Sequence, residues 1–214
     1  MSAVLSASGD AAGMLVLPEV TVANPDVDRL VTDLAAASIG ATCNMYSDLV
    51  DGGGERRGWL RRYLTARWQA PVVLVGEAAG YAGARLSGIA FTSVYQLGAG
   101  TQKELSAAIV HKTLAVLGAE EQVLLWNTVP THPHQPGQPR SNRTPTAAEV
   151  AAGAAFLSRV AAGRLVVGVG RIAARQADAP YIRHPSHGGA RAFADGLAAV
   201  LADTVCARHG GDGA

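Results

Sequence analysis

Three short runs of apolar, mostly β-branched residues constrain the fold of this chain most strongly. They cover residues 71–75 (Pro-Val-Val-Leu-Val), 123–126 (Val-Leu-Leu-Trp) and 165–169 (Leu-Val-Val-Gly-Val). Unbroken apolar runs of this length are typical of strands buried on both faces, as in a parallel sheet. Segments with helical spacing separate them, and Tyr181 with Ile182 indicates a fourth strand. The pattern predicts a three-layer α/β/α sandwich around a central, mainly parallel four-stranded sheet.

The predicted helices have recognisable ends. Asn24 is suited to begin the first helix and Gly40 to end it, and Thr146 with Glu149 forms a capping box. The glycines of residues 51–54 predict a flexible break. In chain order, the expected helices are a segment over 24–40, a basic amphipathic segment after residue 54, residues 102–117, a segment that begins at Thr146, a short segment after residue 169, and residues 189–202.

Length and composition indicate one compact domain. The chain has 214 residues, of which 49% are apolar, enough for one sizeable core. We expect residues 1–18 to form a disordered tail, 19–208 a single domain and 209–214 a second tail. The sequence has neither a charged-then-apolar leader nor an apolar run of 18 residues. We therefore expect a cytoplasmic, soluble monomer that makes no membrane contact.

The charges are distributed unevenly, although the net charge is only +1. From Arg56 to Arg143 there are eight Arg and two Lys against four Glu, whereas residues 1–55 carry eight acidic residues and one Arg. A basic middle segment of this kind favours contact with a phosphate backbone, and an ordinary solvated surface explains it equally well.

Chemically distinctive motifs follow the predicted strands. They are residues 76–80 (Gly-Glu-Ala-Ala-Gly), 126–130 (Trp-Asn-Thr-Val-Pro) and 183–186 (Arg-His-Pro-Ser). In α/β proteins, sites form at the carboxyl ends of parallel strands. Together with residues 141–146 (Ser-Asn-Arg-Thr-Pro-Thr), the set resembles the uracil-DNA glycosylase superfamily, and most closely its branch whose first motif reads Gly-Glu-Ala-Pro-Gly. The resemblance covers roughly residues 70–195.

The resemblance implies a DNA glycosylase domain with DNA as its partner. Such an enzyme flips a pyrimidine, uracil by default, out of the stack and excises it by hydrolysis, leaving an abasic site. The resembled branch holds an iron–sulfur cluster on four cysteines. This chain has only Cys43 and Cys206, which cannot supply that cluster. We therefore expect no metal cluster, no other metal and no cofactor.

The resemblance also implies three catalytic residues. His184 donates to the pyrimidine O2, where charge collects as the glycosidic bond breaks. Asn127 reads the edge of the flipped base, because an amide both donates and accepts. Glu77 positions water, stabilises the cationic sugar or braces its loop. The best-known branch has an Asp at the position of Ala78, and no general base replaces it here.

A base pocket is implied by the same motifs. Phe91 matches the ring that stacks on the base, and the first motif supplies the wall at Gly76, Ala78, Gly80 and Tyr81. The strictly uracil-specific branch carries, at the position of Gly80, a Tyr that excludes the thymine methyl. A small residue there opens the pocket to 5-substituted pyrimidines.

The loop after the third motif is implied to contact DNA. In the family this loop enters the minor groove, and His187 and Arg191 have side chains long enough to fill the space left by the flipped base. Ser186, Arg143 and Arg140 are the candidate phosphate contacts.

Four alternatives stay open at this point. The substrate could be a bulky pyrimidine such as hydroxymethylated or glucosylated cytosine in an antiphage role, or the chain could bind damaged bases without catalysis. Residues 168–173 (Gly-Val-Gly-Arg-Ile-Ala) match a dinucleotide fingerprint, but no acidic residue ends a strand about 20 residues later. A metal site is the fourth alternative, and its ligands would be His132, His134, His184 and His187.

Overall fold

The computed structural model describes residues 13–19 and 22–209. Residues 1–12 of the first expected tail and 210–214 of the second lie outside the described residues. Residues 13–18 of the first expected tail are described, and some of them contact the core. Leu15 donates its backbone N–H to the Gln96 carbonyl oxygen over 2.8 Å, and Leu15 and Leu17 pack against the core. Their partial burial removes apolar surface from water, so this part of the expected tail packs on the core.

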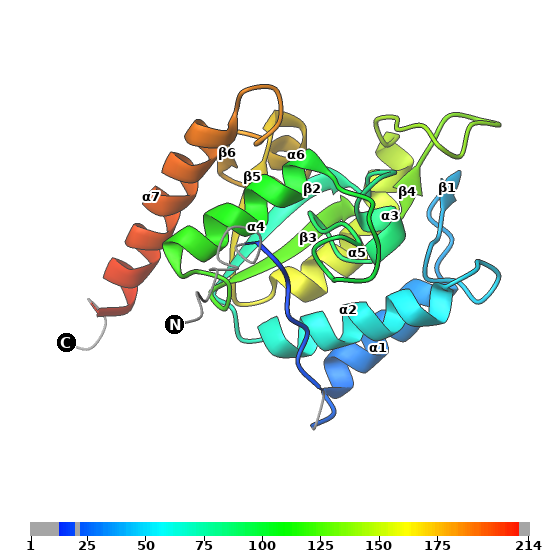
Figure 1. Ribbon diagram of the computed structural model, residues 1–214, viewed down its shortest axis with the longest axis horizontal. Helices are drawn as coiled ribbons and strands as arrows, with labels where there is room; N and C mark the ends of the chain where they lie inside the picture. The colour runs from blue at the N-terminus through cyan, green and yellow to red at the C-terminus, as the bar shows by residue number, and fades with distance from the viewer. Residues whose placement is uncertain (1–12, 20–21, 210–214) are drawn as a thin grey trace, which may run out of the picture.

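Four parallel strands form the central sheet, as the sequence predicts. They are β2 (Val72–Ala78), β3 (Val123–Val129), β5 (Leu165–Val169) and β6 (Tyr181–Ile182), in the order β3-β2-β5-β6 (Figure 1). Every neighbouring pair in this sheet is parallel. β2 and β3 continue past their apolar runs, so the first residues of two motifs are themselves strand residues.

The connections between these strands place helices on both faces of the sheet. β2 leads to β3 through α4 (Leu105–Leu117), and β3 leads back past β2 to β5 through α5 (Ala147–Ala161). Right-handed crossovers in opposite directions put their helices on opposite faces. Figure 1 shows α4 in front of the strands beside α7 (Ala190–His209), and α5 contacts β3. The result is the predicted three-layer sandwich.

The chain reverses its winding between β2 and β5. β2 connects to β3 on one side, whereas β5 connects through α6 (Arg171–Gln176) to β6 on the other. Open α/β sheets bind ligands beyond the carboxyl ends of the strands at such a switch point. The topology therefore predicts a ligand site beyond the ends of β2 and β5.

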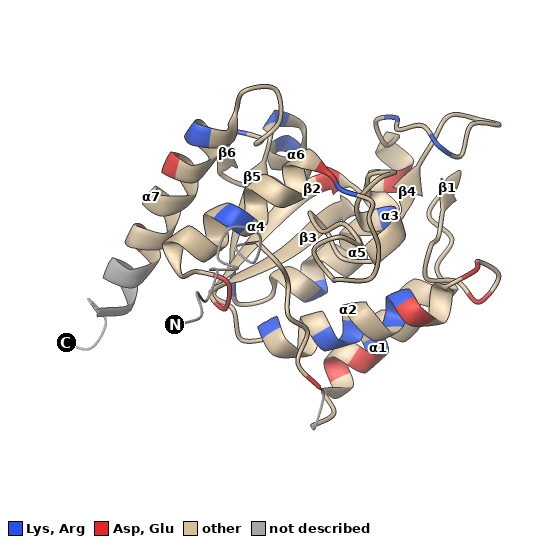
Figure 2. Ribbon diagram, in the orientation of Figure 1, with Lys and Arg blue, Asp and Glu red and all other residues tan. Residues whose placement is uncertain are grey.

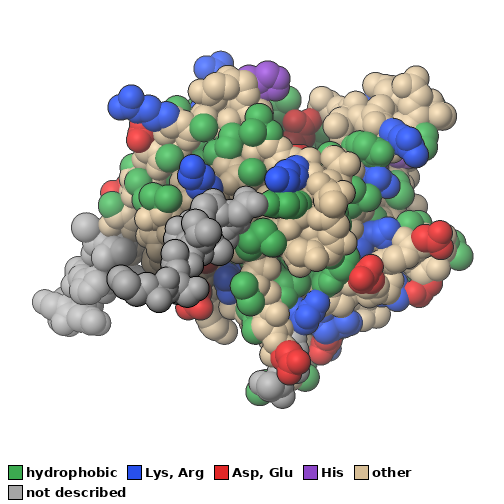
Figure 3. Space-filling model, in the orientation of Figure 1, with side chains coloured by type: hydrophobic (Ala, Val, Ile, Leu, Met, Phe, Trp, Pro, Cys, Tyr) green, Lys and Arg blue, Asp and Glu red, His purple; other side chains and the backbone are tan. Residues whose placement is uncertain are grey.

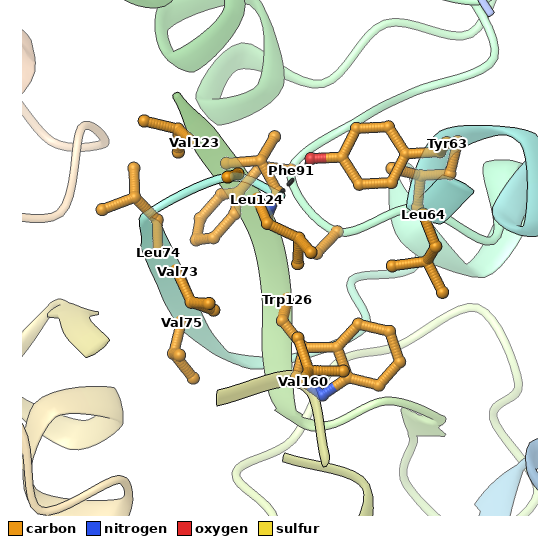
Figure 4. Close-up of a cluster of buried hydrophobic side chains, with 14 of the residues drawn as sticks. Tyr63, Leu64, Val73, Leu74, Val75, Phe91, Val123, Leu124, Trp126 and Val160 are labelled. Atoms are coloured by element: carbon orange, nitrogen blue, oxygen red, sulfur yellow. Dashed lines mark hydrogen bonds between the residues drawn. The ribbon is translucent and has the colours of Figure 1, made fainter. Parts of the chain in front are cut away.

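A side chain, and not another strand, covers the outer edge of β3. Tyr63 lies on α2 (Gly53–Arg67), and its hydroxyl accepts a hydrogen bond from the Leu125 N–H over 2.7 Å. Figure 4 shows its ring reaching toward β3 among buried side chains such as Leu64 and Leu124. The hydroxyl satisfies a backbone amide that the sheet edge leaves unpaired. Burial raises the pKa of Tyr63, so its hydroxyl stays protonated.

The N-terminal helices differ from the prediction in their ends. α1 (Pro25–Ala36) begins after Asn24, as expected, but ends before Gly40. α2 begins at Gly53, within the expected flexible break. A Cβ on Gly53 would overlap the Ser47 carbonyl oxygen. This glycine therefore permits close packing at the start of a helix.

Three short elements lie outside the predicted ones. β1 (Thr42–Cys43) pairs antiparallel with β4 (His132–Pro133), and α3 (Ala84–Ser87) lies in the loop after β2. Elements of this length are too short for a periodic pattern to reveal. Among the described residues, no helix is both long enough and apolar enough to cross a membrane.

Candidate active site

A cavity of about 1000 Å³ opens beyond the carboxyl ends of the strands, at the switch point. The three motifs reach it from β2, β3 and β6, and the segment after β5 joins them. Its lining includes residues 76–80, Phe91, Asn127, residues 169–173, Arg183, His184 and Ser186. The structure thus brings together the residues that the sequence assigned to catalysis and to the base pocket, with the exception of Tyr81.

Gly76 allows two predicted base-binding side chains to approach the sheet. It is paired with Asn127 in the register of β2 and β3. A Cβ built on Gly76 would stand 2.5 Å from Asn127 Oδ1 and 2.7 Å from Phe91 Cζ. Any side chain here would displace both groups. The glycine is needed for this close approach.

Asn127 offers its carboxamide to the cavity. The residue is only 6% exposed, and within the described part of the chain its carboxamide makes no hydrogen bond. The neighbouring Thr128 instead ties the strand ends together, since its hydroxyl donates to the Gly76 carbonyl oxygen over 3.1 Å. Because it lines the cavity and makes no hydrogen bond to the protein, this amide is available to a ligand that supplies a donor and an acceptor.

Phe91 lines the cavity in an uncommon backbone conformation. Its φ is +50°, a value that bulky residues rarely adopt. The loop around it is held by the Ser87 hydroxyl, which donates to the Thr92 carbonyl oxygen over 2.6 Å, and by the Thr92 hydroxyl, 2.9 Å from His111 Nε2. The Phe91 ring lies 6.3 Å from the His184 ring, centroid to centroid, at 44°. Strain fixed by its surroundings is typical of functional sites.

The hydrogen bonds of His184 define its tautomer. The backbone N–H of Ser186 donates to His184 Nδ1 over 3.2 Å, and the Ser186 hydroxyl lies 2.8 Å from the same atom. An amide N–H can only donate, so Nδ1 accepts and the neutral ring carries its hydrogen on Nε2. Burial lowers the pKa of His184, and the charge of Arg183 lowers it further. His184 is therefore a neutral imidazole with an Nε2–H donor.

A tight turn follows His184. Gly189 donates its N–H to the Ser186 carbonyl oxygen over 3.1 Å, and the two residues between them, His187 and Gly188, have φ values of +52° and +74°. A Cβ on Gly189 would overlap the His184 carbonyl oxygen, so the turn folds tightly against the motif. His187 is exposed between these residues. The role of this loop in reaching a DNA groove stays a prediction.

Two carboxyl groups face the cavity, and the sequence indicated only one. Burial raises the pKa of Glu77, and the Thr144 side chain opposes part of this shift. Glu104 precedes α4, and burial raises its pKa as well. A Cβ on Gly80 would stand 3.0 Å from Glu104 Oε1, and one on Gly83 would overlap this carboxylate. Glu104 lies outside every motif, so its place depends on a loop that the sequence pattern does not describe.

Arg143 lines the cavity, but its charge is already balanced. Its guanidinium donates to both carboxylate oxygens of Glu149, over 2.6 and 2.7 Å, and also to the backbone of His134 and Ala41. This hydrogen-bonded pair lowers the pKa of Glu149 to about 2. Arg143 therefore braces the loop before α5 against the start of that helix. This pairing does not favour the phosphate contact, which stays a prediction.

The remaining predicted DNA and base contacts lie outside the cavity lining. Arg140 is exposed in the loop after β4, and Arg191 is exposed in the first turn of α7. The Tyr81 N–H donates to Asn142 Oδ1 over 2.8 Å, and its ring lies 4.4 Å from the Arg85 guanidinium. Tyr81 thus links the end of the first motif to the segment 141–146. Asn142, which does line the cavity, belongs to the motif segment 141–146 that the sequence singled out only as a whole.

Two of the alternatives are not favoured by this geometry. The first is the dinucleotide fingerprint at residues 168–173. A Cβ on Gly168 would overlap Ala174, so this glycine is explained by the packing of α6 on β5. The helix α6 also has only 6 residues. The histidines of the alternative metal site are engaged separately: His132 Nδ1 lies 2.8 Å from the Ala79 carbonyl oxygen, and His184 Nδ1 accepts from Ser186. Over residues 13–19 and 22–209, no three His, Cys, Asp or Glu side chains are grouped as metal ligands.

Comparison with known proteins shows similarity both to a family model and to solved structures. A family model described as the uracil DNA glycosylase superfamily matches residues 63–202. The crystal structure of wild-type SMUG2 from Pedobacter heparinus is similar in fold, with a TM-score of 0.62 and 11% sequence identity over 84% of this chain and 97% of that chain. No curated protein matches this sequence.

Proposed function

This chain belongs to the uracil DNA glycosylase superfamily, and we propose that it is a monofunctional DNA glycosylase that flips out and hydrolyses off a pyrimidine base. Uracil is the default substrate, and the product is an abasic site. The family match supports the reaction class, and the cavity at the switch point supports the residue roles. The observation that carries the proposal is the neutral His184 imidazole with its Nε2–H donor, which lines one cavity together with Phe91 and Asn127.

The imidazole matches the charge that develops in the reaction. As the glycosidic bond breaks, the sugar becomes cationic and the departing base anionic. An N–H donor placed at the base oxygen stabilises the transition state more than the ground state. His184 is fixed for this task because Ser186 occupies its other nitrogen. Its lowered pKa keeps the ring from becoming an imidazolium near neutral pH.

Two further residues hold the base. The Phe91 ring supplies a face for stacking, which contributes on the order of 1–3 kcal/mol per base. The free carboxamide of Asn127 offers one donor group and one acceptor for the edge of a pyrimidine. Both groups approach the position that a Cβ on Gly76 would occupy, within 2.5 Å for Asn127 Oδ1 and 2.7 Å for Phe91 Cζ, so a base that stacks on the ring can also reach the amide.

Glu77 is proposed to act on the sugar side of the bond. Ala78 supplies no carboxylate, so Glu77 is the acidic residue of the first motif. Its ionised form would stabilise a cationic sugar and orient a water molecule. Burial raises its pKa, which makes the carboxylate a better proton acceptor than an exposed one.

Hydrolysis, and not attack by an amine, is the expected route. A glycosylase that also cleaves the strand uses an amine nucleophile to form a Schiff base. The chain has two lysines, Lys103 and Lys112, and neither belongs to the cavity lining in the described part of the chain. Lys103 lies over the Tyr95 ring instead, 3.9 Å from its centroid.

A bulky modified pyrimidine is the second candidate substrate. The cavity volume of about 1000 Å³ lies at the upper end of the range for small-molecule sites and leaves room beside a pyrimidine ring. Hydroxymethylated or glucosylated cytosine in phage DNA would use that room, in which case the chain would act in antiphage defence.

Incubation with defined oligonucleotides tests the proposal. The panel contains uracil, thymine, hydroxymethylcytosine and glucosylated hydroxymethylcytosine, each as a single and a double strand, and alkaline cleavage reveals abasic sites. We expect release of one base class and no strand cleavage without alkali. Binding to the panel without release of any base would identify a damaged-base binding module instead.

A further inference from the structure

Two arginines at the rim of the cavity have no acidic partner within residues 13–19 and 22–209. Arg171 follows β5, Arg183 follows β6, and both are exposed and line the cavity. The ion pairs of the described residues involve Arg57, Arg61, Arg143, Arg159 and Arg191, so neither rim arginine is neutralised. Arg183 makes one side-chain hydrogen bond, from Nη2 to the His187 carbonyl oxygen over 3.4 Å. Both guanidinium groups therefore carry charge that no acidic side chain of the described residues balances.

The sheet places these two arginines next to each other. β5 and β6 are parallel neighbours, and the Gly170 N–H donates to the Ile182 carbonyl oxygen over 2.9 Å just before Arg171 and Arg183. Figure 2 shows basic residues on α6 and at the start of α7, at the end of the molecule where the loops after β5 and β6 lie. In Figure 3, a histidine and basic side chains stand together there, with an acidic side chain set deeper beside them.

The interior of the cavity has the opposite character. Glu77 and Glu104 face it, and both are partly removed from solvent. Carboxylates repel a phosphate, and guanidinium groups bind one bidentately. The charge arrangement therefore favours a nucleotide that places its base inside the cavity and its phosphates at the rim.

We infer that Arg171 and Arg183 bind the backbone phosphates of the DNA strand that carries the extruded nucleotide. This inference rests on the proposed function, because it takes the occupant of the cavity to be a DNA base. It assigns the phosphate contact to two residues outside the sequence-predicted set and leaves Arg143 as an internal brace. The charge of Arg183 also lowers the pKa of His184, so the phosphate site and the donor are electrostatically linked.

Salt-dependent DNA binding tests the inference. The probe is a fluorescent duplex with a tetrahydrofuran abasic-site analogue, which cannot be cleaved, titrated at several NaCl concentrations between 50 and 200 mM. We expect Arg171→Ala and Arg183→Ala each to weaken binding about tenfold and to reduce the salt slope by about 0.9, the value for one lost phosphate contact. Arg175→Ala is the matched control, because it removes the same charge from α6 at an exposed residue outside the cavity lining.

The outcomes separate this inference from the proposed function. If Arg171→Ala and Arg183→Ala both bind the duplex with the affinity and the salt slope of the wild-type chain, the inference alone is overturned. An equal loss of affinity in Arg175→Ala also overturns it. Failure of the wild-type chain to bind the duplex or to release any base overturns both. Arg171→Gln and Arg183→Gln retain the side-chain stem and replace the alanine variants if these melt at a lower temperature.

Discussion

Gly76 and Asn127 lie opposite each other at the ends of β2 and β3, with no room for a methyl group between them. A Cβ on Gly76 would stand 2.5 Å from Asn127 Oδ1. Gly76→Ala should therefore displace the carboxamide and the Phe91 ring and slow base release at least tenfold, measured under single-turnover conditions. Gly58→Ala is the control: apart from its chain neighbours and the backbone of its own helix, no atom lies within 4 Å of its added Cβ, and alanine in a helix gains about 1 kcal/mol over glycine. Equal rates in both variants would contradict the packing argument.

Asn127 should control which pyrimidine is accepted. Asn127→Asp replaces the amide donor with an acceptor while keeping the size of the side chain. We expect the relative rates on the oligonucleotide panel to change, together with a lower rate on the best wild-type substrate. An unchanged profile at an unchanged rate would make Asn127 a structural residue.

Gly80 distinguishes the two candidate substrates. Gly80→Tyr introduces the ring that strictly uracil-specific relatives carry, and the ring must pass the Glu104 carboxylate, 3.0 Å from the Cβ position. If uracil is the substrate, much of the activity should remain, because uracil leaves space at C5. Release of a glucosylated base should be abolished, since packed sites do not accommodate an added aromatic ring without strain.

A double variant, Gly80→Tyr with Glu104→Ala, removes the expected collision, and thermal melting of both variants detects misfolding. Persistent release of a glucosylated base from either variant would mean that this wall does not face the 5-substituent.

Stability should depend on pH through His111. Burial, with the Arg67 charge nearby, lowers the pKa of His111 to about 4 from 6.5. Between these values the unfolded chain binds more protons than the folded one, so the free energy of unfolding falls as the pH is lowered, by on the order of 3 kcal/mol. His111→Gln cannot titrate, and its urea-unfolding free energy should vary less between pH 7 and 4.5. Equal pH slopes for the variant and the wild type would contradict this assignment.

The sequence predicted the sheet and the convergence of the motifs for a simple reason. Apolar runs reveal buried parallel strands, and the carboxyl ends of such strands meet, so Asn127 and His184 had to lie near the first motif. The partners of individual side chains could not be predicted in this way. Arg143 and Arg183 carry the same charge. Arg143 differs only because Glu149 lies against its guanidinium in the folded chain, whereas Arg183 has no such carboxylate beside it among the described residues. Glu104 and the φ of Phe91 likewise depend on loop geometry, which has no periodic signal.

The single-turnover rate of uracil release by wild-type chain and His184→Ala tests the central claim most directly. We expect the wild-type chain to release uracil from DNA and His184→Ala to do so about a hundredfold more slowly or worse, the scale for losing one donor to a developing anion. His134→Ala, outside the cavity lining, should keep the wild-type rate, and all three proteins should melt alike. A His184→Ala rate equal to that of the wild type would remove the imidazole from the mechanism.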